Sequence, residues 1–208
     1  MGKKIIAVNA GPRKGWNTDI LIREAGAGAE SKGAEVEYID LFRLEKYTGC
    51  ISCFGCKREP DLGRCVCRDG LADVLEKIRN CDGLIIGSPI YIMDLTASFR
   101  ALFERLIFQY ITYKKEVGSY SSKKIPVTLI VTGNMQEEGI RKFAESYKGS
   151  FERFIGPTEV LSCGNTLQVN NYEDFGWTMF DWDERRKRRE DIFPSERENA
   201  YRLGAGMV

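Results

Sequence analysis

Histidine is absent from this chain of 208 residues. Near neutral pH, histidine is the side chain that proteins use most often as a general base and as a metal ligand. Without it, a metal site in this chain has to use thiolates, carboxylates or a cofactor. Any acid–base chemistry also has to come from other groups.

Long apolar runs and a dominant charge are lacking as well. No stretch approaches the roughly 20 apolar residues that a helix needs to cross a bilayer. The N-terminal segment MGKKIIAVNAGPRKG has neither the long apolar core nor the cleavage site of a signal peptide. Lysine and arginine number 31 against 30 acidic residues, a net charge of +1. We therefore expect a cytoplasmic protein that binds neither nucleic acid nor a membrane.

The pattern along the chain is that of a single α/β domain over residues 1–208. Short apolar runs that predict strands alternate with segments of helical periodicity. Such alternation is typical of a parallel sheet with helices on both faces. Two segments stand apart from it, a cysteine-rich loop at 42–68 and a charged helical tail at 183–208. The predicted strands span residues 4–9, 36–41, 82–88, 126–132 and 158–163.

The first turn from strand to helix, NAGPRKGWNTD, has the features of an anion site. A helix N-terminus offers unpaired amides and a positive dipole end. Gly11 and Gly15 allow close approach of the backbone, Arg13 can fork onto phosphate oxygens, and Asn17 and Thr18 can donate or cap. The turn is neither Gly-x-Gly-x-x-Gly nor a Walker sequence, and it suits a mononucleotide such as FMN. The alternative is an ordinary capped turn with a surface arginine.

Two further strand ends carry polar or loop-forming residues. The third predicted strand ends in Ser88-Pro89-Ile90-Tyr91, and the fourth in Thr132-Gly133-Asn134. Because parallel strands present their carboxyl ends at one edge of a sheet, both should meet the first turn there. The sequence thus predicts one ligand site made by three loops.

Five of the seven cysteines fall between Cys50 and Cys67. The spacing Cys50-x2-Cys53-x2-Cys56 is like that of ferredoxin loops, which take a fourth ligand from elsewhere. Free or redox-active thiols and a structural zinc are the alternatives. Cys81 and Cys163 lie beside predicted strands and are expected to be core residues.

The first turn resembles the Gly-Ser-Pro-Arg…Asn-Thr loop of the NADPH-dependent FMN reductase and iron–sulfur flavoprotein superfamily, and Ser88-Pro89-x-Tyr91 resembles its flavin loop. Ala10 and Gly11 depart from the pattern, so one hydroxyl donor to phosphate is missing. The resemblance implies a flavodoxin-like three-layer sandwich with a five-stranded parallel sheet in the order 2-1-3-4-5. The FMN-binding residues it implies are Gly11, Pro12, Arg13, Asn17, Thr18, Ser88, Pro89, Ile90, Tyr91, Thr132, Gly133 and Asn134.

The cysteines also resemble the compact motif of iron–sulfur flavoproteins, in which a fourth cysteine follows shortly after the third. Here eight residues separate Cys56 from Cys65, and Gly63-Arg64-Cys65 matches the family's Gly-x-Cys. The resemblance implies a [4Fe–4S] cluster near the flavin. Its expected ligands are Cys50, Cys53, Cys56 and Cys65, with Cys67 as the alternative to Cys65.

These features predict an FMN-dependent oxidoreductase that passes electrons from NAD(P)H or a ferredoxin-like carrier to an acceptor. The flavin carries the chemistry, so no catalytic acid or base is required, and Tyr91 is the one candidate. The alternatives are an electron carrier without a nicotinamide site, a cluster-free FMN reductase and a non-catalytic zinc module. The apolar segment 95–113 predicts a homodimer or homotetramer, unless it is a buried core helix.

Overall fold

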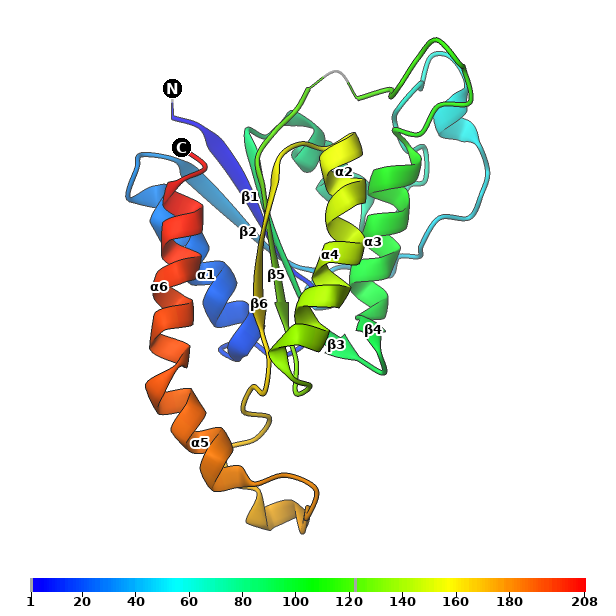
Figure 1. Cartoon of the computed structure of the whole chain (residues 1–208). Helices are drawn as coiled ribbons and strands as arrows, with labels where there is room; N and C mark the ends of the chain where they lie inside the picture. The colour runs from blue at the N-terminus through cyan, green and yellow to red at the C-terminus, as the bar shows by residue number, and fades with distance from the viewer. Residues whose placement is uncertain (1, 122) are drawn as a thin grey trace.

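The computed structural model describes residues 2–121 and 123–208. Its centre is a parallel sheet with the strand order β2-β1-β3-β5-β6 (Figure 1). The predicted flavodoxin-like class and the order of the five parallel strands are confirmed. These strands are β1 (Lys4–Asn9), β2 (Glu35–Asp40), β3 (Gly83–Tyr91), β5 (Val127–Thr132) and β6 (Thr158–Cys163).

A short sixth strand, β4 (Asp94–Leu95), was not predicted. It pairs antiparallel with the end of β3. The two residues of the turn between them, Ile92 and Met93, have φ values of 48° and 61°. Such turns usually contain asparagine or glycine, so this sequence gives no hairpin signal.

Both faces of the sheet are covered, which explains why its central strands are apolar throughout. Alternate residues of β1 point to opposite faces. Ile6 and Val8 join the core beneath one helical layer, while Ile5 and Ala7 join the core beneath the other. The first layer contains α2 (Ala72–Asn80), α3 (Ala97–Phe108) and α4 (Glu137–Phe154); the second contains α1 (Asn17–Glu30) and α6 (Phe193–Ala205).

The charged tail forms two helices with different surroundings. α5 (Trp182–Asp191) has no residue buried among those described. Pro194 lies in the first turn of α6, where proline is well tolerated. α6 then runs along α1 so closely that a Cβ on Gly204 would lie 1.7 Å from the Ala25 carbonyl oxygen. The end of the tail is therefore part of the domain's core.

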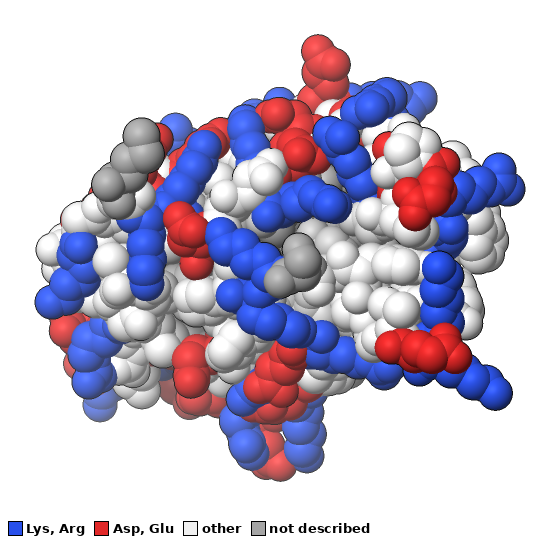
Figure 2. All heavy atoms as spheres, turned by 90° about the horizontal axis from the view of Figure 1, so that it is seen from above, with Lys and Arg blue, Asp and Glu red and all other residues white. Residues whose placement is uncertain are grey.

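The apolar segment 95–113 is largely a core helix. In α3, Phe99, Leu102 and Leu106 are fully buried within the chain. Association of chains through this segment stays a prediction. No helix in residues 2–121 and 123–208 is long and apolar enough to cross a membrane. Lysine and arginine side chains are interspersed with acidic ones on the face shown in Figure 2.

Candidate functional site

A pocket of about 290 Å³ lies at the carboxyl edge of the parallel strands. Every residue predicted to bind FMN lines it, except Ser88. The first turn, the end of β3 and the end of β5 therefore meet at one place, as the strand topology requires. We call this hollow the flavin pocket.

The first turn is held in shape by side chains on its two sides. The Asn9 Oδ1 accepts the Gly11 N–H at 2.8 Å, and the Asp19 Oδ2 accepts the Gly15 N–H at 2.7 Å. Gly15 has a φ of 73°, which a side chain would disfavour. At the start of α1, the Trp16 side chain makes no capping hydrogen bond within the described residues. The first amides of α1 are therefore left for another acceptor.

Asn17 and Thr18 are buried and tie the first turn to distant parts of the chain. The Asn17 Nδ2 donates to the Leu167 carbonyl at 2.9 Å. The Asn17 Oδ1 accepts from the Arg189 guanidinium of α5. The hydroxyl groups of Thr18 and Thr132 lie 2.7 Å apart. The side chains of the first turn thus also hold the pocket together.

The end of β5 is packed closely against α4 at Gly133. A Cβ on Gly133 would lie 2.6 Å from the Ile140 Cδ1. Thr166 donates both its N–H and its hydroxyl to the Gly133 carbonyl, each at 3.0 Å. Next to it, the buried Asn134 Oδ1 has no hydrogen-bond partner in the described part of the chain. A donor on a bound ligand would satisfy that oxygen.

Ser88 lies behind the pocket. It is fully buried; its hydroxyl donates to the Pro89 carbonyl at 2.9 Å and accepts the Thr96 N–H at 3.1 Å. Thr96 in turn caps α3 by accepting the Phe99 N–H and donates to the Ala10 carbonyl. The Ser88 side chain therefore supports the flavin loop from inside the protein.

Several residues that line the pocket belong to no motif recognised in the sequence. Most of them are in the segment after β6, far along the chain from the three predicted loops. Arg13 donates to the Gln168 carbonyl at 2.5 Å, and its guanidinium lies 4.3 Å from the centre of a Trp16 ring. Trp177 packs against the buried Tyr172 with ring centres 5.7 Å apart. The only signal was the aromatic content of this segment. The lining residues not predicted are Trp16, Thr166, Gln168, Val169 and Trp177.

All five clustered cysteines line a second, smaller hollow, which we call the cysteine hollow. Its remaining walls include Arg105, Phe108 and Gln109 of α3 and the residue after it. Cys53 lies between Ser52 and Phe54, which both have a φ of 56°. Left-handed conformations at non-glycine residues cost energy and often occur at functional sites.

α3 fixes the backbone of the cysteine loop at several points. The Cys50 N–H donates to Glu104 at 3.2 Å, and the Cys65 N–H donates to the Gln109 Oε1 at 3.0 Å. Lys57 reaches the other way and donates to the Ile111 carbonyl at 2.7 Å, beyond the end of α3. These bonds hold the cysteines in place without using their sulfur atoms.

Arg105 connects the cysteine loop to Asp69. This arginine is 2 % exposed, and its Nη1 lies 2.6 and 2.7 Å from the two Asp69 carboxylate oxygens. Its Nη2 donates to the Cys67 carbonyl at 3.1 Å. Burial alone would raise the pKa of Asp69. The hydrogen bonds from Arg105 and from the Leu71 and Thr48 amides outweigh burial, so the pKa is lowered.

The cysteine hollow fits a metal cluster in its donor set. Burial raises the pKa of the Cys56 and Cys67 thiols, while Lys57 and Arg105 act in the opposite direction. Two buried donors at this hollow, Arg105 Nε and Gln109 Nε2, have no acceptor among the described residues. No three cysteine or acidic side chains of residues 2–121 and 123–208 are grouped closely enough to hold a single metal ion.

Arg105 and Phe108, in the last turn of α3, line the cysteine hollow, whereas the flavin pocket lies beside the strand end at Ser88 that contacts Thr96 at the start of α3, and the two share no lining residue. A helix of 12 residues is about 18 Å long. Within one chain, the structure therefore does not place the cysteines next to the flavin pocket, contrary to the predicted nearness of cluster and flavin. The cysteine loop runs along the sheet and folds over the far end of α3.

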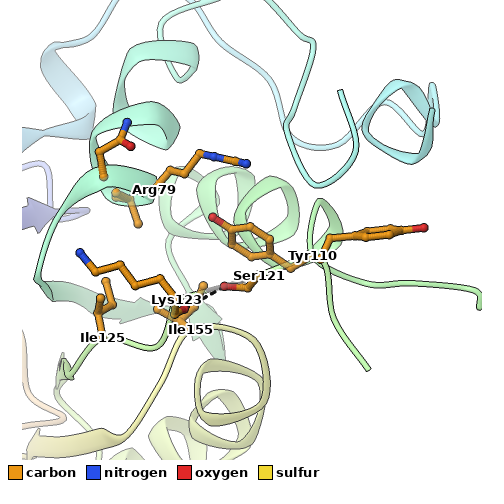
Figure 3. Close-up of a pocket in the computed structure, with 9 residues that line it drawn as sticks. Arg79, Tyr110, Ser121, Lys123, Ile125 and Ile155 are labelled. Carbon is orange, nitrogen blue, oxygen red and sulfur yellow. Dashed lines mark hydrogen bonds between the residues drawn. The ribbon is translucent and has the colours of Figure 1, made fainter. Parts of the chain in front are cut away.

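A third hollow, shown in Figure 3, contains none of the strand-end residues. Arg79, Tyr110, Ser121 and Lys123 line it. Lys123 already pairs with Asp82 at 2.8 Å, and Arg79 donates to the Gly63 carbonyl at 2.6 Å. These bonds brace the chain beside the cysteine loop. The predicted core positions of Cys81 and Cys163 are confirmed, since both are fully buried.

Comparison with known proteins agrees with this fold and these motifs. The family model for NADPH-dependent FMN reductase matches residues 3–141. The chain is 36 % identical over 102 residues to an iron–sulfur flavoprotein of Methanocaldococcus jannaschii, a match covering 49 % of this chain and 51 % of that one. The iron–sulfur flavoprotein of Methanosarcina thermophila is 32 % identical over 104 residues, covering 50 % and 52 %. The chain thus matches about half the length of these curated relatives.

Solved structures share the fold at low sequence identity. An NAD(P)H:quinone oxidoreductase from Methanothermobacter marburgensis superposes with a TM-score of 0.70 at 14 % identity, covering all of both chains. An azoreductase from Bacillus anthracis gives 0.63 at 14 % identity, covering 98 % of this chain and 99 % of that one. The match of the family model over two thirds of its length shows that this chain belongs to the NADPH-dependent FMN reductase family.

Proposed function

We propose that this protein is an FMN-dependent oxidoreductase that passes electrons from NAD(P)H or a reduced carrier to an acceptor. The meeting of three strand ends in one pocket carries the proposal. Gly11, Pro89 and Gly133 come from three different strand ends, and all line the flavin pocket. Family membership supports FMN as the ligand.

The phosphate of FMN would lie at the start of α1. The first amides of the helix have no capping side chain there, and the helix dipole favours an anion. Arg13 is exposed at the same pocket and supplies a positive charge. The backbone would take over the role of the missing loop hydroxyl, since Gly11 has no side chain.

The ring of FMN would lie toward the ends of β3 and β5. Asn134 there offers an acceptor that has no partner in the described part of the chain, and Tyr91, 44 % exposed, borders the pocket. When bound, FMN supplies the transfer of a hydride or of single electrons, and the protein positions and tunes it. Trp16 and Trp177 also line the pocket and would limit access of water to the ring.

We further propose that the cysteine hollow holds a [4Fe–4S] cluster on Cys50, Cys53, Cys56 and Cys65. The curated relatives are named iron–sulfur flavoproteins, and the five thiols face one hollow with buried donors. Thiolate ligands to a cluster persist where cysteines stay reduced, which agrees with a cytoplasmic protein.

Because the two hollows lie at opposite ends of α3, a second copy of the chain is the simplest way to bring a cluster close to a flavin. A homodimer or homotetramer is therefore part of the proposal. Sedimentation of the loaded protein at micromolar concentration tests it. A monomer at all concentrations would contradict it.

The function is tested on protein purified without oxygen and then offered FMN. We expect flavin absorbance bands, bound FMN in a one-to-one ratio, and anaerobic oxidation of NADH or NADPH with an added acceptor. Arg13→Ala should weaken FMN binding. Lys14→Ala, a change of the adjacent cation outside the pocket, should not. Bound FMN without nicotinamide oxidation would indicate an electron carrier, and failure to bind FMN would refute the proposal.

A further inference from the structure

The side-chain amide of Gln109 has its oxygen hydrogen-bonded and its nitrogen without a partner among the described residues. The residue is 3 % exposed, and its Oε1 accepts the Cys65 N–H at 3.0 Å. Because the Cys65 amide can only donate, the side-chain oxygen has to face it. The Nε2 then lies on the other side of the amide, where no acceptor exists among the described residues.

Arg105 also has one buried donor without an acceptor among the described residues. Its Nη1 is used by the Asp69 carboxylate and its Nη2 by the Cys67 carbonyl. The third donor position, Nε, is buried and has no partner in residues 2–121 and 123–208. A folded protein seldom leaves a buried N–H without an acceptor, since the lost hydrogen bond to water is not replaced.

Both residues line the cysteine hollow, together with all five clustered cysteines. The neighbouring cation Lys57 does not line this hollow, and it donates instead to the carbonyl groups of Phe108, Gln109 and Ile111. Two unused donors therefore remain at a hollow whose chemically distinctive groups are sulfur atoms.

We propose that Arg105 Nε–H and Gln109 Nε2–H donate hydrogen bonds to sulfur atoms of the iron–sulfur cluster in the cysteine hollow, and thereby raise its reduction potential. The inference rests on the cluster proposed above. Reduction adds an electron, whose negative charge spreads over the sulfur atoms. A hydrogen bond to sulfur stabilises that reduced form more than the oxidised form. The positive charge of Arg105 acts in the same direction.

Arg105 and Gln109 are positioning and tuning residues in this scheme, since they act on the cluster through its sulfur atoms. Arg105 lies in the last turn of α3 and Gln109 directly follows the helix, so the two side chains are four residues apart on one face. The same two side chains hold the backbone of Cys65 and Cys67, so the position of the thiols and the polarity around them are set together.

The test is a reductive titration of the FMN-loaded full chain after anaerobic cluster assembly, followed by electron paramagnetic resonance. Gln109→Glu keeps an acceptor for the Cys65 N–H but removes the donor. Arg105→Lys keeps the charge near Asp69 but removes Nε. Arg188→Lys is the matched control, because Arg188 is also a largely buried arginine paired with a carboxylate, that of Glu196, but lies outside the cysteine hollow. Iron, sulfide and FMN are counted in each protein.

We expect both hollow variants to keep their iron and to show a lower midpoint potential, while Arg188→Lys matches the wild type. A shift of about 59 mV corresponds to a tenfold change in the ratio of reduced to oxidised cluster. If one of the two variants loses its iron, the midpoint potential of the other variant tests the inference. Unchanged potentials in iron-loaded variants would overturn the inference and leave the proposed function intact. Loss of iron from both variants would overturn it too, by assigning them to loop structure alone. A wild type that binds FMN but assembles no cluster would overturn the cluster and this inference together.

Discussion

The hydroxyl groups of Thr18 and Thr132 lie 2.7 Å apart at the base of the flavin pocket. Thr18 is in the first turn of α1, and Thr132 is the last residue of β5. Both are at most 5 % exposed. This contact joins the first turn to the strand end that we expect to face the flavin. It therefore ties two walls of the flavin pocket together.

The effects of replacing the two threonines should not add. The double variant should lose less stability than the sum of the two single losses. Thr132→Val leaves the Thr18 hydroxyl buried without its partner, a loss of about 1–3 kcal/mol. Adding Thr18→Val removes the stranded group. Urea unfolding of the two single variants and the double variant measures the coupling. Additivity within about 0.5 kcal/mol would show that the two hydroxyl groups do not interact.

Because α1 and α6 are in close contact, replacing glycine by alanine should change stability in opposite directions at two positions. A Cβ on Gly204 would lie 1.7 Å from the Ala25 carbonyl oxygen, so Gly204→Ala should destabilise the protein by about 1–3 kcal/mol through overpacking. Gly149→Ala in α4 is the control, because no atom lies within 4 Å of its added Cβ. There alanine should stabilise the helix by about 0.5–1 kcal/mol. Thermal unfolding of both variants gives the signs, and equal shifts would show that the helices can separate freely.

The sequence was sufficient to predict the parallel sheet, because its central strands are apolar on both faces and alternate with helices. The same regularity predicted which loops meet, since parallel strands end at one edge. Gly11, Pro89 and Gly133 needed only their place after a strand to be assigned to one pocket.

Contacts between distant segments could not be predicted in this way. Asn17 is bonded to Arg189, which is 172 residues further along the chain in a helix without buried residues. Ser88 has the right place in sequence, but Thr96 turns its hydroxyl inward. The cysteine loop is held at the far end of α3 by bonds that Arg105 and Gln109 make, and no sequence pattern indicated these bonds.

The ion pair of Asp69 with Arg105 should make stability depend on pH in the acid range. The folded-state pKa of Asp69 lies below its ordinary value, so the carboxylate contributes stability above the unfolded pKa of about 3.9. That contribution is lost as the pH falls through the lower, folded-state pKa. Asp69→Asn, which leaves the buried Arg105 without its counter-charge, should cost about 3 kcal/mol at pH 7.

The measurement is the free energy of unfolding of wild type and Asp69→Asn between pH 7 and pH 2.5. We expect the difference between them to be constant above about pH 5 and to shrink below pH 4. Asp73→Asn is the control, since that carboxylate pairs at the surface with Lys77 and should cost under about 1 kcal/mol. A difference that grows on acidification would contradict the role given to Asp69.

The two remaining candidates for the fourth cluster ligand should behave differently when each is changed to serine. Cys65 lines the cysteine hollow, and Gln109 fixes its backbone there by accepting the Cys65 N–H. Cys67 is instead held through its carbonyl by Arg105. We therefore expect Cys65→Ser to lose most of about four iron atoms per chain, while Cys67→Ser keeps them. The control is Cys81→Ser, a fully buried cysteine outside the hollow, which should keep its iron. Iron and sulfide analysis after anaerobic purification distinguishes the variants. Loss of iron from Cys67→Ser but not from Cys65→Ser would make Cys67 the fourth ligand. The bond from Arg105 to the Cys67 carbonyl would then position the backbone of a ligand.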